Sequence, residues 1–291
     1  MTGLHVQDLV TEFELSSGVF RALDGITFEV GDSEIVGIVG ESGSGKSTII
    51  RSVIKLLMHP GRVTAGTAHF GGRDLLQMSE RELRQIRGKE IGFVAQNPFS
   101  ALNPVLRIGK QFANISNAHG QKFDRHARQR AIDLLQATEV SDPERVIRGY
   151  AHELSGGMAQ RVVIAMALYL NPGLLIADEP TTALDLIVQR QVLDTLRRLT
   201  AESGRAMLIV THDLGVVAKY CDRVLVMYNG RLVEQGPVSE VFANPRDPYT
   251  ISLLESVVRP EDSEDARAAE PAESSGRDPV ALGQPTISGG Y

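Results

Sequence analysis

The chain has 291 residues, of which 42% are hydrophobic and 23% are charged, so it can bury one large core or two modest ones. Its formal net charge of −6, the lack of Trp and an aromatic content of 5% argue against a protein that binds nucleic acid by phosphate contacts and base stacking. Its single cysteine, Cys221, excludes an intramolecular disulfide and favours a reducing compartment.

Neither a signal peptide nor a membrane-spanning segment is expected. The N-terminus has no basic stretch followed by an apolar one. No run approaches the roughly 18 apolar residues that a spanning helix needs. If the protein works at a membrane, another chain must cross it.

The strand and helix patterns change along the chain. Residues 4–13 and 26–30 predict an antiparallel flank, because no long helix lies between them. Apolar runs alternating with amphipathic stretches then predict an α/β sheet with parallel strands at its centre, and Asn229–Gly230 predicts a hairpin turn. The predicted buried strands are 34–39, 91–95, 174–177, 207–210 and 224–227, and predicted helices include 46–57, 131–137 and 188–199.

A glycine-rich loop follows the first of these buried strands and opens a helix. It fits the pattern G-x-x-x-x-G-K-[ST] in full, so its backbone N–H groups and the helix N-terminus predict a phosphate-binding site. Lys46 is expected to reach the β- and γ-phosphates of ATP, and Ser47 to bind Mg²⁺. The loop residues expected to contact ATP are Gly40, Ser42, Gly43, Ser44, Gly45, Lys46, Ser47 and Thr48.

Two acidic residues end the apolar strand 174–177. Acids at the carboxyl end of a buried strand lie beside the ligand crevice of an open α/β sheet. Because successive residues point to opposite sides of a strand, the two acids need not share a role. Asp178 is expected to hold Mg²⁺, and Glu179 to orient or deprotonate the attacking water.

Gln96 and His212 follow two other predicted strands in the same way. Gln96 is a candidate contact to Mg²⁺ or to the attacking water, and His212 a candidate contact to the γ-phosphate. Taken alone, a glutamine at the surface or a histidine at a strand end is more often structural.

The segment Leu154-Ser155-Gly156-Gly157-Met158-Ala159-Gln160-Arg161 resembles the LSGGQ signature of ABC ATPases, with Met158 where Gln is commonest. The other motifs stand in the family's order, with Ala183-Leu184-Asp185 as the D-loop. The resemblance covers residues 4–258 and implies a P-loop NTPase (RecA-like) core with an antiparallel β flank and an inserted helical subdomain. It makes Glu179, His212 and Gln96 the catalytic candidates, and Ser47, Gln96 and Asp178 the Mg²⁺ candidates.

The family also implies that two ATPase subunits close head to tail. Ser155, Gly156, Gly157 and Asp185 would then act in trans on ATP bound to the partner's phosphate loop. An aromatic residue near the N-terminus usually stacks on adenine in this family. We choose Phe13, with Phe20 second.

The predicted domains follow the same resemblance. Residues 1–96 and 159–240 form the RecA-like ATP-binding core with the β flank, and 97–158 the helical signature subdomain. Residues 241–260 form a short C-terminal permease-ATPase segment. Residues 261–291 are rich in acidic, Ser, Pro and Ala residues and predict a disordered acidic tail.

A closer resemblance is to the ATPases of oligopeptide/dipeptide (peptide/nickel) permease importers. It rests on the stretches 87–91, 96–104, 150–153 and 244–250. It implies an ATP-hydrolysing subunit at the cytoplasmic face of the inner membrane of a bacterium. The implied partners are two permease chains, a sister ATPase in a heterodimer and an extracytoplasmic solute-binding protein, with no nucleic acid.

Two other function classes remain open from the sequence. A soluble ABC ATPase of translation or DNA repair usually fuses two ATPase units or carries a long coiled coil, and neither pattern is seen here. An ATP-dependent regulator that drives no transport is disfavoured by the complete acid pair and His212.

Overall fold

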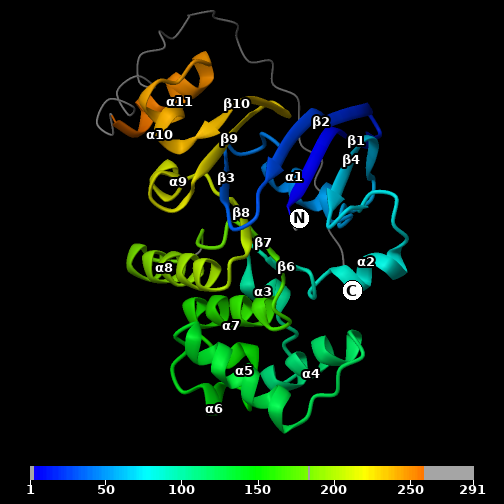
Figure 1. Cartoon of the computed structure of the whole chain (residues 1–291), viewed down its shortest axis with the longest axis vertical. Coiled ribbons are helices and arrows are strands. Elements are labelled where there is room, and N and C mark those ends of the chain that lie inside the picture. The colour runs from blue at the N-terminus through cyan, green and yellow to red at the C-terminus, as the bar shows by residue number, and fades with distance from the viewer. Residues whose placement is uncertain (1–2, 183, 259–291) are drawn as a thin grey trace, which may run out of the picture.

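The computed structural model describes residues 3–182 and 184–258. Two sheets and a group of helices make up this part of the chain (Figure 1). The predicted acidic tail, 261–291, and Ala183 of the predicted D-loop lie outside the described residues.

The larger sheet has the strand order β10-β9-β3-β8-β7-β6, in which β10 pairs antiparallel with β9 and all other neighbours are parallel. Strands β3, β7 and β8 are buried along their whole length, as the continuous apolar runs predict. The strands of the larger sheet are β3 (Ile35–Val39), β6 (Ile91–Val94), β7 (Leu174–Asp178), β8 (Ala206–Val210), β9 (Arg223–Tyr228) and β10 (Arg231–Pro237).

The smaller sheet is antiparallel, with the order β2-β1-β4-β5. It is the β flank predicted from the N-terminal pattern. Its strands are β1 (Leu4–Leu15), β2 (Gly18–Val30), β4 (Gly61–Phe70) and β5 (Arg73–Asp74). Residues of β1, β2 and β4 share one hydrophobic cluster with residues of β3, β7 and β8, so this sheet packs onto the larger one.

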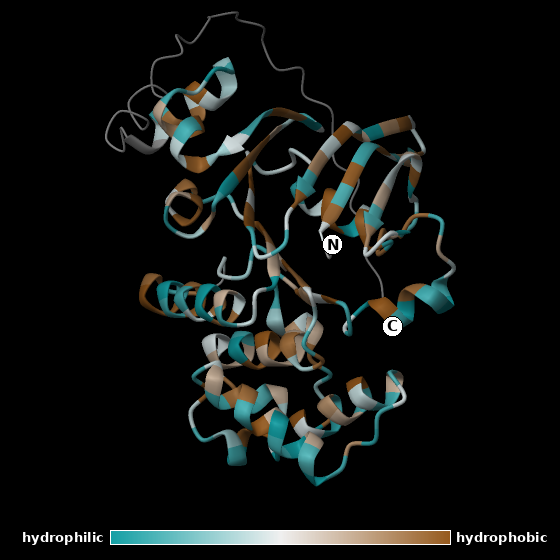
Figure 2. Cartoon of the chain, in the orientation of Figure 1, coloured by the Kyte–Doolittle hydropathy of each residue, from teal (hydrophilic) through white to brown (hydrophobic). Residues whose placement is uncertain are grey.

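Helices between β6 and β7 form a separate group at the lower end of the molecule in Figure 1. They are α3 (Pro98–Ala101), α4 (Ile108–Ala118), α5 (Arg125–Ala137), α6 (Pro143–Val146), the 3₁₀ helix η1 (Ala151–Glu153) and α7 (Gly156–Leu168). Phe112 of α4 meets Tyr169 edge to face with ring centroids 5.1 Å apart, and the Tyr169 hydroxyl lies 3.0 Å from that of Ser116. Figure 2 shows α7 mainly hydrophobic, whereas α4 and α5 carry both hydrophobic and hydrophilic residues, as expected for helices with one solvent face.

The remaining helices lie beside the two sheets. They are α1 (Lys46–Val53), α2 (Glu80–Ile86), α8 (Leu186–Glu202), α9 (Leu214–Tyr220), α10 (Val238–Ala243) and α11 (Pro248–Val258). Among the described residues, no helix is long and apolar enough to cross a membrane.

The predicted fold class is confirmed, with differences at element ends. Helix α1 ends at Val53 instead of residue 57, because the chain turns there and Lys55 has a φ of +49°. Asn229 and Gly230, with φ values of +45° and +77°, form the predicted hairpin turn between β9 and β10. The predicted boundary at residue 158 falls inside α7, and the division of the chain into domains stays a prediction.

Candidate active site

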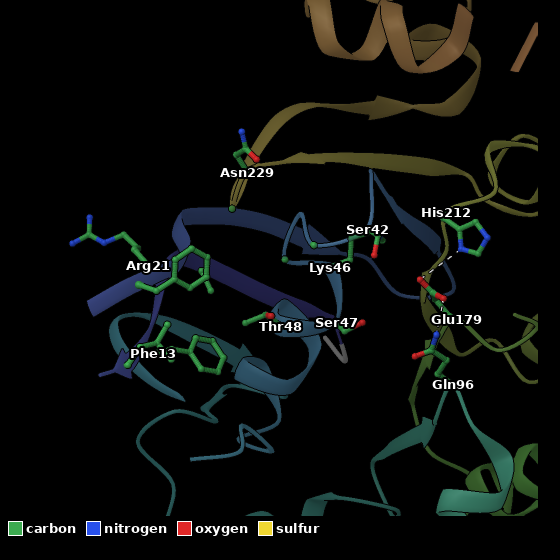
Figure 3. A pocket seen from close by; sticks show the side chains of 16 residues that line it. Phe13, Arg21, Ser42, Lys46, Ser47, Thr48, Gln96, Glu179, His212 and Asn229 are labelled. Carbon is green, nitrogen blue, oxygen red and sulfur yellow. Dashed lines mark hydrogen bonds and ion pairs between the residues drawn. The ribbon is translucent and has the colours of Figure 1, made fainter. Parts of the chain in front are cut away.

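Four neighbouring strands of the larger sheet end at the same edge, and each leads into candidate residues. The glycine-rich loop follows β3, Glu179 follows β7, His212 follows β8, and Gln96 follows β6. They line a pocket of about 930 Å³ (Figure 3). The predicted site residues that line it are Phe13, Ser42, Gly43, Gly45, Lys46, Ser47, Thr48, Gln96, Glu179 and His212.

The glycine-rich loop is packed tightly against the end of β9. A Cβ at Gly40, which has a φ of +149°, would lie 2.1 Å from the carbonyl oxygen of Met227, so only glycine fits there. Gly40 therefore supports the loop and does not line the pocket, and the side chain of Ser44 is buried behind it.

Lys46, the first residue of α1, is only 5% exposed. Its Nζ donates to the carbonyl oxygens of Gly40 and Glu41, each at 2.8 Å. Burial lowers the pKa of Lys46, and the nearby carboxylates, Glu179 first among them, oppose that shift. A buried ammonium in a glycine-rich loop at the start of a helix is suited to bind an anion such as the phosphates of ATP.

Asp178 lies beneath the pocket and is 1% exposed. Its Oδ1 accepts a hydrogen bond from Ser47 Oγ at 2.7 Å, and its Oδ2 lies 3.9 Å from Nη2 of Arg51. Burial raises the pKa of Asp178, whereas the Ser47 hydrogen bond and the Arg51 charge oppose the shift. The hydroxyl and carboxylate oxygens that meet here are ligands that a hard divalent cation such as Mg²⁺ prefers.

Glu179 has partners that Asp178 does not share, as the alternation along a strand predicts. Its Oε2 accepts from Nε2 of Gln96 at 2.9 Å and from the Thr182 hydroxyl at 2.8 Å. Its Oε1 lies 3.6 Å from Nδ1 of His212 (Figure 3). Glu179 also has a φ of +44°, rare for a residue with a side chain, and its N–H donates to Val210 O at 2.9 Å. The strained backbone is thus held by β8.

The side of the pocket opposite Glu179 comes from the smaller sheet (Figure 3). Phe13 of β1 and Phe20 of β2 are directly paired across the strands, and both line the pocket. Phe20 is 56% exposed, whereas Phe13 is partly buried and lies close to Gly61. The structure therefore keeps both as candidates for an adenine contact.

The residues expected to act in trans lie outside this pocket. Ser155 caps α7, where its hydroxyl accepts from Met158 N–H at 3.3 Å, and Asp185 caps α8. The two helix starts are neighbours, because a Cβ at Gly157 would lie 2.8 Å from Cγ1 of Val188. Gly156 has open space around it. The structure gathers these residues at one place but does not bring them to the pocket of the same chain.

Several residues around the site were not predicted from the sequence. Thr182 contacts Glu179, and its position three residues after Glu179 indicates that the two side chains are close. Arg51 stands four residues after Ser47 and so on the same helix face, a spacing that also indicates a place near the site. Arg21 and Asn229 line the pocket from β2 and the β9–β10 turn, and no local pattern points to them.

Known sequences resemble this chain over most of its length. A family model described as "ABC transporter" matches residues 23–182, and one described as "Oligopeptide/dipeptide transporter, C-terminal region" matches 233–282. The chain is 46% identical over 255 residues to the oligopeptide transport ATP-binding protein OppD of Bacillus subtilis, covering 87% of this chain and 71% of OppD. It is 44% identical over 259 residues to the dipeptide transport ATP-binding protein DppD of Escherichia coli, covering 88% and 79%.

Solved structures support the same assignment. The ATP-binding cassette MJ0796, in a dimeric post-hydrolysis state bound to ADP and Pi, matches with a TM-score of 0.73 and 27% identity over 81% of this chain and 98% of that one. The protein cbiO1 of Clostridium perfringens, part of the ABC transporter complex cbiONQ, matches with a TM-score of 0.68 and 28% identity over 91% of this chain and 97% of that one. A family model matches more than half of its length, and relatives more than 40% identical are covered over more than two thirds of their length, so this chain belongs to the ABC transporter family of ATP-binding proteins.

Proposed function

We propose that this chain hydrolyses ATP to power a bacterial importer of peptides or related small solutes, at the cytoplasmic face of the inner membrane. The observation that carries the hydrolytic part is the position of Glu179, which Gln96, Thr182 and His212 surround beside the phosphate loop. The cargo part rests on relatives whose names are those of oligopeptide and dipeptide transport proteins.

In this proposal, the glycine-rich loop binds the phosphates of ATP. Its backbone N–H groups and the start of α1 supply positive potential, and Lys46 exchanges its two carbonyl partners for the β- and γ-phosphates. Hydrogen bonds to a charged group are stronger than those to a neutral carbonyl, which favours the exchange.

Ser47, Asp178 and the side-chain oxygen of Gln96 are proposed to hold Mg²⁺. When bound, the cation neutralises charge that develops on the phosphate oxygens. Asp178 is suited to this role because it is buried, so its carboxylate is fixed in direction by Ser47 and Arg51.

Glu179 is proposed to accept a proton from the attacking water. Gln96 and Thr182 hold one oxygen of its carboxylate, which leaves the other turned towards His212. His212 is proposed to contact the γ-phosphate from the end of β8. Glu179 has a positive φ, and such backbone strain is common at functional sites, where it helps to fix the direction of a side chain.

A second subunit is proposed to complete the site. Ser155, Gly156 and Gly157 of a sister ATPase, together with its Asp185, would cap the ATP bound here. Ser155, which caps α7, is exposed, and the first N–H groups of a helix have no partner within the helix, which suits that role. Two permease chains and an extracytoplasmic solute-binding protein complete the proposed assembly.

Phe13 is proposed as the residue that stacks on adenine. Replacing Phe13 by Ala should weaken ATP binding about three- to tenfold, because an aromatic stacking contact is lost. Titration calorimetry with ATP on purified protein measures the change. Phe20→Ala is the matched comparison, and a larger loss in that variant than in Phe13→Ala would move the assignment to Phe20.

The loop after Gln96 is proposed to contact the permease. Phe99, on α3, is 46% exposed although hydrophobic. Phe99→Asp should lower ATP-dependent peptide uptake by host cells to below about a tenth of the wild-type rate, since a charge would replace the proposed apolar contact with the permease. ATP binding should not change.

Met58→Asp is the control for this prediction, because Met58 is an exposed apolar residue of another loop. Unchanged peptide uptake in Phe99→Asp would contradict the proposed docking site. Unchanged peptide uptake in cells that lack this chain would contradict the proposal that peptides are its cargo.

A further inference from the structure

The C-terminal segment reaches the phosphate loop through one tyrosine. Tyr249, in the first turn of α11, accepts a hydrogen bond at its hydroxyl from the N–H of Glu41 at 2.9 Å. The two residues are 208 positions apart in the chain. Figure 1 shows α10 and α11 at the β9–β10 side of the larger sheet, where this contact forms.

The peptide unit that Tyr249 contacts is also the one that holds Lys46. Its N–H belongs to Glu41 and donates to Tyr249, while its C=O belongs to Gly40 and accepts from Lys46 Nζ at 2.8 Å. The next carbonyl, that of Glu41, accepts from Lys46 at 2.8 Å and from Ser44 N–H at 3.2 Å. A hydrogen-bonded chain therefore runs from the Tyr249 hydroxyl through one peptide group to the Lys46 ammonium.

The Tyr249 ring is itself held in place. It packs on the ring of Tyr228, with centroids 4.3 Å apart, and Tyr228 directly follows the Met227 carbonyl against which Gly40 is packed. Tyr249 also packs on a hydrophobic cluster that contains Val39, the residue before the loop. The Tyr249 side chain is therefore held by the same part of the structure that the start of the phosphate loop packs against.

The backbone leading into α11 is fixed by Glu234 of β10. Its two carboxylate oxygens accept from the N–H groups of Arg246 and Asp247 at 2.9 and 3.1 Å. Asp247 Oδ1 in turn accepts from Tyr249 N–H at 2.9 Å. These hydrogen bonds fix the backbone position from which the Tyr249 side chain extends.

We propose that Tyr249 is a positioning residue of the nucleotide site. Its hydroxyl fixes the peptide between Gly40 and Glu41, and so keeps the first half of the phosphate loop and Lys46 in the arrangement that receives ATP. A loop ordered before binding loses less conformational entropy when ATP arrives, so the affinity is higher. This inference rests on the assignment of residues 40–48 as the ATP-binding loop, and it gives the C-terminal segment a direct role in ATP binding.

The test compares Tyr249→Phe with Tyr228→Phe in the full chain. Tyr249→Phe removes the hydroxyl and keeps the ring on Tyr228. The control removes a hydroxyl that makes no hydrogen bond among the described residues. Three quantities are measured: the Kd for ATP by calorimetry, the thermal midpoint without nucleotide, and hydrogen exchange of the peptide that contains residues 40–48.

We expect Tyr249→Phe to weaken ATP binding about three- to tenfold, the usual value of one hydrogen bond. Exchange of the loop amides should become faster, and the thermal midpoint should stay as in the wild type. Tyr228→Phe should change none of the three. If Tyr249 had a purely structural role, Tyr249→Phe would instead lower the thermal midpoint. The hydrogen exchange of the loop and the Kd for ATP would then both stay unchanged.

Wild-type affinity in Tyr249→Phe would overturn the proposal. An equal loss in Tyr228→Phe would also overturn it, because the effect would then not be specific to the hydroxyl that contacts Glu41. The assignment of the loop has its own outcome. If the wild type itself bound no ATP, residues 40–48 would not be the nucleotide site, and the failure would lie there instead of at Tyr249.

Discussion

Replacing Glu179 by Gln should stop ATP turnover and leave ATP binding nearly unchanged. The amide keeps the size of the side chain and can still contact Gln96 and His212, but it cannot take a proton from water. General-base catalysis contributes about 10² to 10⁴ in rate, so phosphate release should fall by at least about a hundredfold. A coupled phosphate-release assay measures this fall, and calorimetry measures the ATP affinity.

Glu202→Gln is the charge-matched control, because Glu202 is an exposed carboxylate in the last residue of α8. Its turnover should equal that of the wild type. Near-normal turnover in Glu179→Gln would assign the proton acceptor to another group. Loss of ATP binding as well would mean that the substitution had disturbed the pocket and not only the chemistry.

Replacing Lys46 by Ala should remove tight ATP binding. The substitution deletes the buried ammonium that faces the loop, and charged hydrogen bonds contribute about 1.5–3 kcal/mol each. The Kd for ATP should therefore rise by about tenfold to more than a hundredfold. The result is read by calorimetry over a wide range of ATP concentrations.

Lys110→Ala serves as the control, because Lys110 is exposed on α4. The thermal midpoint of Lys46→Ala must be checked as well, since the Gly40 and Glu41 carbonyls lose their partner in this variant. A Lys46→Ala protein that is folded and binds ATP as tightly as the wild type would contradict the assignment of the loop.

The strands of the larger sheet could be predicted because each is a short apolar run buried on both sides, a pattern that depends little on the rest of the chain. Helix ends were less predictable. Helix α1 continues as an apolar pattern beyond Val53, but Lys55 takes a left-handed conformation and the chain turns back to β4. That turn is set by tertiary packing and leaves no mark in the periodicity.

The side of the pocket that holds the candidate catalytic residues could also be predicted. Parallel strands bring their carboxyl ends to one edge, so residues that follow β3, β6, β7 and β8 had to meet there. The other side was harder, because Phe13 and Phe20 are partners across two strands and share one face. Local patterns cannot separate two such residues.

Long-range contacts explain what the sequence could not predict. Asn229 enters the pocket only because the β9–β10 turn lies beside the loop, where Gly230 N–H donates to Ser44 O at 3.0 Å. Tyr249 reaches the loop from the C-terminal segment in the same way. Neither contact has a periodicity or a spacing that would reveal it.

The pocket of one chain also contains only part of the proposed site. Ser155 and Asp185 cap helices that start next to each other, yet neither lines the pocket beside Glu179. This arrangement is what a head-to-tail pair requires, because each subunit would present these helix starts to the ATP of the other. The pairing itself stays a proposal.

One purification can show whether this ATPase works as part of a membrane importer. The Glu179→Gln variant of the full chain is tagged in its native host, where it should remain in the ATP-bound state, and the membranes are solubilised with ATP present. We predict that two permease chains and a sister ATPase copurify, with a solute-binding protein that would carry the cargo. Recovery only from the soluble fraction, together with ribosomes or DNA, would contradict the transport function and leave the ATPase assignment standing.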